Sequence, residues 1–366
     1  MKKILFPLLQ SNKGGNVVST ISICNKINKK KFNTFVLIIR KKNENKIDIK
    51  SLNFNSDIKV DSLQINYDSK ILFIINFYFK LIKYHIKYRF DVVHTNDGLL
   101  NLYYSILCFL FRADHILHLR NTDNSRRNYL SFFLAKKIIC ISEFVKNKIP
   151  SFFNEKKVVL YNYVDFFNNK IELKRKHEKF IKKNKNKFFV FFISNIHKRK
   201  NPKVFIDLIS RLNSTQNKFI GLMFFQSEKN RLLNLKKYIK KKKIEKKIIL
   251  YYNYPLHYWV PFLKYTKKKV LFAPSENEPL GRNIIEAVLK NIYVFANNSG
   301  GHKEIIDRSN GILINDIYSN KLNYIVDSFF RNYDRYPKKN SLKKTFIKKF
   351  QDKKYIKKIE KIYLEK

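Results

Sequence analysis

Acidic residues and cysteines are scarce in this chain. Its 366 residues include 28 Asp and Glu against 76 Lys and Arg, so the formal net charge is +48 at pH 7. The only cysteines, Cys24, Cys108 and Cys140, are scattered through apolar surroundings and give neither a disulfide framework nor a metal-ligand spacing. No Asp-x-Asp sequence follows a predicted strand, so we expect neither a metal site nor a cofactor.

Long hydrophobic runs are also lacking. The mostly apolar run at 99–111 has thirteen residues, which is short of the roughly twenty that span a bilayer. At the amino terminus, Met-Lys-Lys is followed by only six apolar residues, too few for a signal peptide. We therefore expect a cytoplasmic protein, either soluble or peripheral at the inner face of the membrane.

The cationic excess has two interpretations. It would ordinarily indicate nucleic acid, but Lys is accompanied by abundant Asn, Ile, Phe and Tyr, whose codons are also A/T-rich, and no groove-reading or base-stacking motif is found. We expect no specific nucleic-acid partner. An anionic membrane surface would still attract the chain, at about 1 kcal/mol per Lys or Arg. Segment 70–89 fits a helix lying on such a membrane, and equally a core-packed helix whose lysines extend to solvent.

The segment 272–306, FAPSENEPLGRNIIEAVLKNIYVFANNSGGHKEII, has the pattern strand, loop, helix, then strand, Gly-Gly loop and helix. Two such units predict a parallel α/β sheet with ligands at the carboxyl ends of its strands. Glu278 is expected in the first loop and Glu286 roughly 8 Å further along the helix, so both can contact one elongated ligand. Amides at the start of that helix, which favour a phosphate, belong to Leu280, Gly281, Arg282 and Asn283.

This segment resembles the signature of retaining glycosyltransferases of family 4, the group 1 glycosyl transferases, in its Glu-x7-Glu pair, its Gly-Arg and its Gly-Gly-x-x-Glu. It departs from the family at Asn291 and Tyr293, where Gly and Pro are usual, but Asn also adopts the left-handed conformation that ends a helix. The resemblance implies an α/β GT-B fold, in which two Rossmann-like domains with parallel sheets face a central cleft. The expected parts are an acceptor-binding domain at 1–165, a linker at 166–187, a nucleotide-sugar domain at 188–340 and a basic helix at 341–366 packing back toward the first domain.

The resemblance also implies which residues hold the donor. Glu278 would contact the donor sugar and Glu286 the ribose. Asn195 stands where the family has an Arg, so Lys198 or Arg199 would supply part of the charge. The diphosphate would be held by Lys200, Gly14, Gly15 and the amides of the helix start.

A second group of residues follows strands of the first domain. FDVVHTNDGLL resembles the family's Asp-Val-Val-His strand end, which would place His94, Asn96 and Asp97 at the cleft rim. Arg120 stands where relatives often have a His that contacts the transferred sugar, so we assign catalytic roles to Glu278, His94 and Arg120. Residues expected to bind the acceptor are Asn96, Asp97, Arg126 and Arg127.

The resemblance implies a metal-independent, retaining glycosyltransferase. It would move a sugar from a nucleoside-diphosphate sugar, a co-substrate, to a hydroxyl of a glycan or lipid-linked acceptor in bacterial cell-surface polysaccharide synthesis, such as lipopolysaccharide or capsule. The alternatives that stay open are a GT-B sugar-nucleotide epimerase or phosphorylase, an inactive relative, and a non-enzymatic basic protein that binds polyanions.

Overall fold

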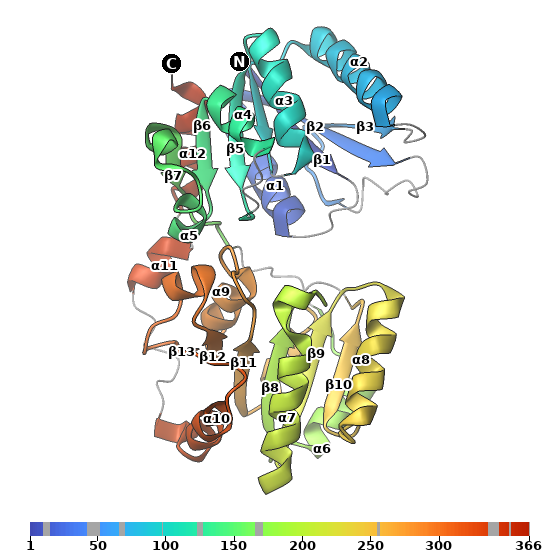
Figure 1. Ribbon diagram of the computed structural model, residues 1–366, viewed down its shortest axis with the longest axis vertical. Coiled ribbons are helices and arrows are strands. Elements are labelled where there is room, and N and C mark those ends of the chain that lie inside the picture. The colour runs from blue at the N-terminus through green and yellow to red at the C-terminus, as the bar shows by residue number, and fades with distance from the viewer. Residues whose placement is uncertain are drawn as a thin grey trace. The chain divides into compact units, whose positions relative to one another are not determined.

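The computed structural model divides the chain into two compact units, Met1–Tyr163 with Lys349–Lys366, and Val164–Lys348. Each unit is built on one parallel sheet with helices packed against it (Figure 1). The residues that the structure describes are 1–9, 15–41, 52–65, 70–96, 98–122, 127–164, 171–254, 257–335, 344–350 and 353–365.

The first unit has a seven-stranded sheet in the order β3-β2-β1-β4-β5-β6-β7. The strand order reverses between β1 and β4, and such switch points are where open α/β sheets bind ligands. The central strands are short apolar runs buried on both faces, as parallel strands covered by helices require, whereas the edge strands β3 and β7 are only partly buried. Their bounds are β1 (Lys2–Leu9), β2 (Phe32–Lys41), β3 (Lys59–Ile65), β4 (Val92–Thr95), β5 (Asp114–Leu119), β6 (Lys137–Cys140) and β7 (Lys157–Val159).

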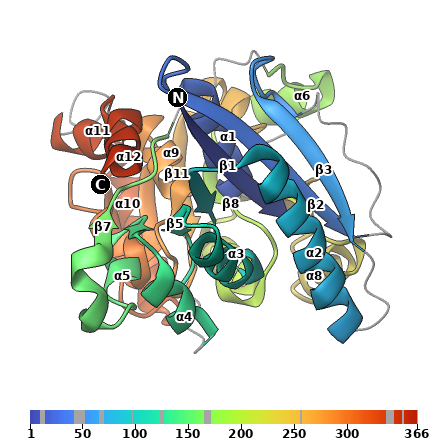
Figure 2. The same ribbon diagram turned by 90° about the horizontal axis from the view of Figure 1, so that it is seen from above.

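Helices cover both faces of this sheet. Ile4, Phe6 and Leu8 of β1 pack with α1 (Gly15–Lys26) and α12 (Tyr355–Leu364). Leu5 points to the other face, as alternation along a strand demands, and packs with α2 (Lys70–Tyr88) and α3 (Leu99–Leu110). In Figure 2, α2, α3 and α4 (Arg127–Leu134) follow one another along that face. Two short helices complete the unit, α5 (Glu143–Lys146) and η2 (Ser151–Lys156).

Helix α2 is the segment for which the sequence offers two interpretations. Phe77 and Leu81 are buried against the sheet, so the core-packed interpretation is confirmed for one face of the helix. Phe79 and Ile86 on the same helix are each 56% exposed, so a second apolar face remains uncovered. In the described part of the chain, no helix has the length and apolarity needed to cross a bilayer.

The carboxyl-terminal segment, expected as a single basic helix, contains two helices, α11 (Lys344–Phe350) and α12. Residues from Lys349 onward belong to the first unit. Ile359 and Tyr363 of α12 are fully buried in the core that β1 and α1 share. The end of the chain is therefore part of the first unit's hydrophobic core.

The second unit has a six-stranded parallel sheet in the order β10-β9-β8-β11-β12-β13. The strand bounds are β8 (Phe188–Ile193), β9 (Phe219–Phe225), β10 (Ile248–Tyr252), β11 (Lys268–Ala273), β12 (Tyr293–Asn297) and β13 (Gly311–Ile314). The α-helices are α6 (Arg175–Lys183), α7 (Pro202–Gln216), α8 (Lys229–Lys241), α9 (Arg282–Leu289) and α10 (Lys321–Arg331). The 3₁₀ helices are η3 (Lys198–Lys200), η4 (Val260–Lys264), η5 (Gly300–Glu304) and η6 (Tyr333–Arg335).

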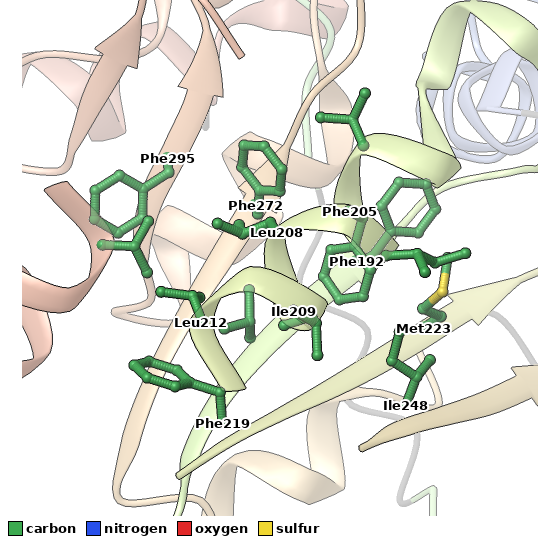
Figure 3. Packing of buried hydrophobic residues seen from close by; sticks show 14 of the residues in the cluster. Phe192, Phe205, Leu208, Ile209, Leu212, Phe219, Met223, Ile248, Phe272 and Phe295 are labelled. Atoms are coloured by element: carbon green, nitrogen blue, oxygen red, sulfur yellow. The ribbon is translucent and has the colours of Figure 1, made fainter. Parts of the chain in front are cut away.

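Phenylalanine dominates the core between this sheet and α7. Figure 3 shows Phe192 and Phe272 from neighbouring strands packed with Phe205 of α7. Gly221 of β9 allows close packing, since a Cβ atom there would lie 2.9 Å from the Phe205 ring. Burial of one such ring contributes about 1.5–3 kcal/mol. The tightly packed core fixes the ends of β8 and β11, where the candidate site lies.

Candidate active site

The loop between β11 and α9 is shaped for a helix start at the edge of the sheet. Gly281 precedes α9 with a φ of 101°, a left-handed conformation that side chains rarely adopt. The side-chain amide of Asn283 donates to the carbonyl of Ile193 at 2.7 Å and so ties the helix start to the end of β8. At the other end of α9, Asn291 has a φ of 58°, which confirms that Asn takes the left-handed position usually held by Gly.

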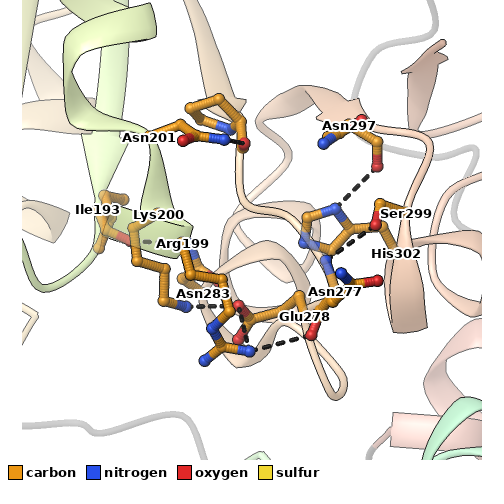
Figure 4. A network of polar contacts seen from close by, with 11 residues as sticks. Ile193, Arg199, Lys200, Asn201, Asn277, Glu278, Asn283, Asn297, Ser299 and His302 are labelled. Atoms are coloured by element: carbon orange, nitrogen blue, oxygen red, sulfur yellow. Dashed lines mark hydrogen bonds and ion pairs between the residues drawn. The ribbon is translucent and has the colours of Figure 1, made fainter. Parts of the chain in front are cut away.

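Glu278 lies in this loop beside two cations. Its Oε2 atom is 2.6 Å from Nζ of Lys200 and 3.8 Å from Nη1 of Arg199. Figure 4 shows both cationic side chains directed at the carboxylate. Burial alone would raise the pKa of Glu278, but the charges of Lys200 and Arg199 overcome it and hold the pKa below the usual value. The carboxylate is therefore ionised at neutral pH and accepts hydrogen bonds.

The Gly-Gly loop after β12 packs directly on the backbone of Glu278. The amide of Gly301 donates to the Glu278 carbonyl at 2.7 Å. A Cβ atom on Gly300, whose φ is 64°, would lie 2.4 Å from that carbonyl oxygen. The paired glycines thus allow the two backbones to approach each other closely.

His302 follows these glycines and is almost fully buried. Its Nδ1 atom lies 2.9 Å from the carbonyl of Asn297 and donates to it, so Nε2 is the unprotonated nitrogen of the neutral ring. Burial lowers the pKa of His302, although the nearby Glu278 charge opposes that shift. The imidazole therefore presents an acceptor next to the carboxylate loop.

Glu286, on α9, is held by a second pair of basic side chains. Its Oε1 atom is 2.9 Å from Nε of Arg282 and 3.2 Å from Nε2 of His257. Burial would raise the pKa of Glu286, but His257 and Arg282 outweigh burial and lower it. An ionised carboxylate that is only 12% exposed suits the two hydroxyls of a ribose, which donate to one oxygen each.

The structure brings together Lys200, Glu278 and Asn283, all predicted site residues, where β8 and β11 end. Asn195 lies nearby in the chain but is exposed. Of the two cations expected to compensate for it, Arg199 is the one that contacts the loop, donating to the carbonyl of Asn277 at 3.0 Å. Leu280 is buried beneath the loop.

Three residues of this region were not predicted from the sequence. His302 stands inside the quoted motif, and its place after the glycines was the available signal. The side-chain amide of Asn201 donates to the carbonyl of Pro274 and to the carboxylate of Glu276. Asn201 has a left-handed backbone conformation, which no sequence pattern predicts. His257 comes from the segment after β10, which carries no motif. In the described part of the chain, no cluster of three or more His, Cys, Asp or Glu side chains is arranged to hold a metal ion.

In the first unit, Arg120 is the centre of a buried polar network at the end of β5. Its Nε donates to Asn96 Oδ1 at 2.8 Å and its Nη1 to Asn162 Oδ1 at 2.7 Å. Its Nη2 lies 3.2 Å from Nδ1 of His118. Because guanidinium only donates, Nδ1 of His118 must be an acceptor.

This fixes the proton on His94. His94 Nε2 lies 3.1 Å from the same His118 Nδ1, so it donates there, and His94 Nδ1 accepts from the hydroxyl of Tyr363 at 2.5 Å. Burial, together with the Arg120 charge, places the pKa of both histidines well below the usual value. His94 is neutral and has no exposed surface, so in this structure it acts only through its neighbours.

The remaining predicted residues are placed only in part. Gly15 is the first residue of α1 and Arg127 the first of α4. Gly14, Asp97 and Arg126 lie outside the described residues.

A model of the family described as glycosyl transferases group 1 matches residues 174–361, just over half of the chain. The chain belongs to this family. It is therefore a glycosyltransferase, as the sequence predicts.

Solved structures match the chain over its full length. HepE of Anabaena, in complex with UDP-glucose, is 17% identical, with a TM-score of 0.78 and 99% of each chain covered. A glycosyltransferase of Rickettsia africae is 22% identical, with a TM-score of 0.74 and coverage of 99% of this chain and 97% of that one. The lipopolysaccharide outer core galactosyltransferase WaaB is 14% identical, with a TM-score of 0.70 and 99% of each chain covered. These matches confirm the GT-B fold. Among curated protein sequences, no match was found.

Proposed function

We propose that this glycosyltransferase moves a sugar from a nucleoside-diphosphate sugar to a hydroxyl of a glycan or lipid-linked acceptor, with retention of anomeric configuration. The observation that carries the proposal is the pair of Glu278 and Lys200, whose side chains are only 12% and 15% exposed, with 2.6 Å between Oε2 and Nζ. A carboxylate that accepts from sugar hydroxyls thus lies beside a cation that can neutralise a departing diphosphate.

The proposed reaction breaks the bond between the anomeric carbon and the diphosphate oxygen, and the electron pair leaves with the diphosphate. The acceptor oxygen forms the new bond on the same face, and its proton passes to the leaving diphosphate. Lys200 and Arg199 offset the charge that develops on that group, and the amides at the start of α9 add to this effect. No metal is needed for this step, since the cationic side chains supply the positive charge.

Glu278 and Glu286 are proposed to divide the donor between them. Glu278 accepts hydrogen bonds from the transferred sugar, and Glu286, oriented by Arg282 and His257, accepts from the ribose. HepE was solved with UDP-glucose, which makes a uridine nucleotide the first donor to test. The lowered pKa of each carboxyl keeps both acceptors ionised at neutral pH.

In the first unit, Arg120 is the proposed substrate-contacting group, and His94 is a positioning residue that orients it through His118. Asn96 and Asp97 are proposed acceptor contacts. Arg126 and Arg127 are proposed to recognise an anionic or lipid-diphosphate acceptor. We further propose that the enzyme acts in the cytoplasm in synthesis of a bacterial cell-surface polysaccharide, such as lipopolysaccharide or capsule, a product class that WaaB exemplifies.

Product analysis tests this function. The purified protein is incubated with UDP-, GDP- and ADP-sugars and a panel of neutral and anionic glycan acceptors, and the products are resolved by mass spectrometry and NMR. A glycoside with the donor's anomeric configuration is the expected product. A free epimerised nucleotide sugar, a sugar phosphate or an inverted glycoside would contradict the proposal.

A further inference from the structure

The helices α2, α3 and α4 cover one face of the first sheet (Figures 1 and 2). They leave large apolar side chains in solvent. Monomeric soluble proteins seldom expose apolar groups in clusters unless something binds there. Six side chains on these helices are between 56% and 68% exposed, namely Ile75, Phe79, Ile86, Phe109, Leu110 and Phe133.

Their spacing on α2 shows that this exposure is a face of the helix. Ile75, Phe79 and Ile86 lie four and seven residues apart, so they form one stripe. Phe77 and Leu81 belong to the opposite stripe and are buried in the core. The helix is therefore apolar on both sides, although the first unit covers only one of them.

Cationic side chains lie directly on these exposed rings. Nζ of Lys83 is 4.4 Å from the centre of the Phe79 ring, and Nζ of Lys156, from η2, is 5.7 Å from that of Phe133. The sequences of α2, α3 and α4 contain no Asp or Glu. The surface thus combines apolar groups with positive charge that no acid on these helices compensates.

We propose that this surface of α2, α3 and α4 docks the enzyme on an anionic lipid bilayer. A bilayer offers both parts of the match, since acyl chains accept the apolar side chains and acidic headgroups attract the lysines. A second copy of the chain fits less well, because a two-fold dimer would bring two acid-free cationic surfaces against each other. The inference concerns the surface of the first unit alone and does not depend on the reaction proposed above.

Vesicle sedimentation with the full-length chain tests the surface. Binding is measured on vesicles of phosphatidylcholine alone and on equimolar phosphatidylcholine and phosphatidylglycerol, at low and physiological salt. The variants are Phe79→Asp with Ile86→Asp, and Lys83→Glu. Tyr324→Asp is the matched control, because Tyr324 on α10 of the second unit is 75% exposed. Circular dichroism and thermal melting verify that each variant is folded.

We expect the wild type to bind the acidic vesicles at least tenfold more tightly than the neutral ones. The affinity for acidic vesicles should fall about tenfold or more in the double variant. In Lys83→Glu it should fall about fivefold for each unit of charge removed, whereas Tyr324→Asp should bind like the wild type. Equal binding to both vesicle types, or equal loss in Tyr324→Asp, would overturn the proposal. So would a wild type that ignores vesicles but self-associates in light scattering through Phe79 and Ile86, because a second copy would then be the occupant.

Discussion

The Nζ atom of Lys200 lies 2.6 Å from Oε2 of Glu278, although the two residues are 78 positions apart in the chain. They meet because β8 and β11 are hydrogen-bonded neighbours in the sheet, so the loops that follow them leave the same edge. Only 12% of the Glu278 side chain is exposed, and a carboxylate so largely removed from water needs a partner of opposite charge. The same contact that makes the loop stable therefore assembles the proposed donor site.

Removing Lys200 should reduce catalysis, while Arg199 remains within 3.8 Å of Glu278 to offset part of its charge in the folded protein. In Lys200→Ala, the departing diphosphate loses one of the cations proposed to offset its charge, and we expect kcat to fall about 10²- to 10³-fold, on the scale of a lost electrostatic donor. Steady-state kinetics measures the change, and urea denaturation verifies the fold. Lys203→Ala is the control, since Lys203 is exposed on α7 and stacks on Tyr238. Full activity in Lys200→Ala would remove Lys200 from the mechanism.

Gly300 should tolerate no side chain. In Gly300→Ala, a methyl group would meet the backbone of Glu278 at 2.4 Å in a left-handed conformation, so we expect a loss of about 2 kcal/mol or more in the free energy of unfolding and weaker nucleotide binding. Gly98→Ala separates the two causes, because Gly98 has a φ of 79° but no atom within 4 Å of its Cβ position. An equal loss in the free energy of unfolding in both variants would mean that backbone strain, and not contact with the Glu278 loop, destabilises Gly300→Ala.

Tyr363 should stabilise the first unit through His94. In Tyr363→Phe, Nδ1 of His94 loses its donor in a fully buried place, and we expect a cost of about 1–3 kcal/mol in the free energy of unfolding. Tyr104→Phe is the matched control, because the structure shows no hydrogen-bond partner for the buried Tyr104 hydroxyl among the described residues. That control should be neutral. Equal costs in the two variants would contradict the hydrogen bond to His94.

Stability should fall as the solution becomes acidic, beginning with the buried histidines. Burial lowers the pKa of His115 from 6.5 to about 3, and it lowers that of His94 and His118 as well. The unfolded chain therefore takes up protons that the folded chain excludes, so stability present above pH 6.5 is lost progressively as the pH falls toward 3. Glu278 and Glu286, whose folded pKa values are also lowered, add to this loss below about pH 4.5.

Urea midpoints measured from pH 7.5 to 4 test this dependence, and His115→Asn should flatten the curve between pH 6.5 and 4.5. A midpoint that does not change over this range in the wild type would show that the histidines are not held neutral.

Most of the segment 272–306 could be predicted because its elements follow from local rules, but the helix expected after the Gly-Gly loop is only the short 3₁₀ helix η5, which begins at Gly300 itself. Apolar runs, turn residues and helical spacing together indicate β11, α9 and β12, and Gly281 marks the helix start. The buried face of α2 follows from the same kind of periodicity, but its exposed face does not, because sequence spacing cannot show which of two apolar stripes is covered.

Contacts between distant segments could not be predicted. His257 reaches Glu286 from a segment without a motif, and Tyr363 meets His94 across 269 positions because α12 folds back into the first unit. The sequence indicates that Arg120 lies at a strand end. It does not indicate that the side chains of Asn96, Asn162 and His118 surround Arg120, because tertiary packing brings them there. Such contacts depend on the order of strands in the sheet, which local patterns do not encode.

Glu278, Lys200 and Glu286 are proposed to form a nucleotide-sugar site, and a nucleotide-binding measurement tests this proposal most directly. The melting temperature of the purified protein is measured with UDP, GDP, ADP, CMP and their common sugars, with and without magnesium. Glu286→Ala is compared with Glu245→Ala, an exposed control in the same unit. We predict a magnesium-independent rise with one nucleoside diphosphate that Glu286→Ala abolishes and Glu245→Ala retains. A wild type that responds to none of these ligands, or a response that Glu286→Ala leaves intact, would contradict the account.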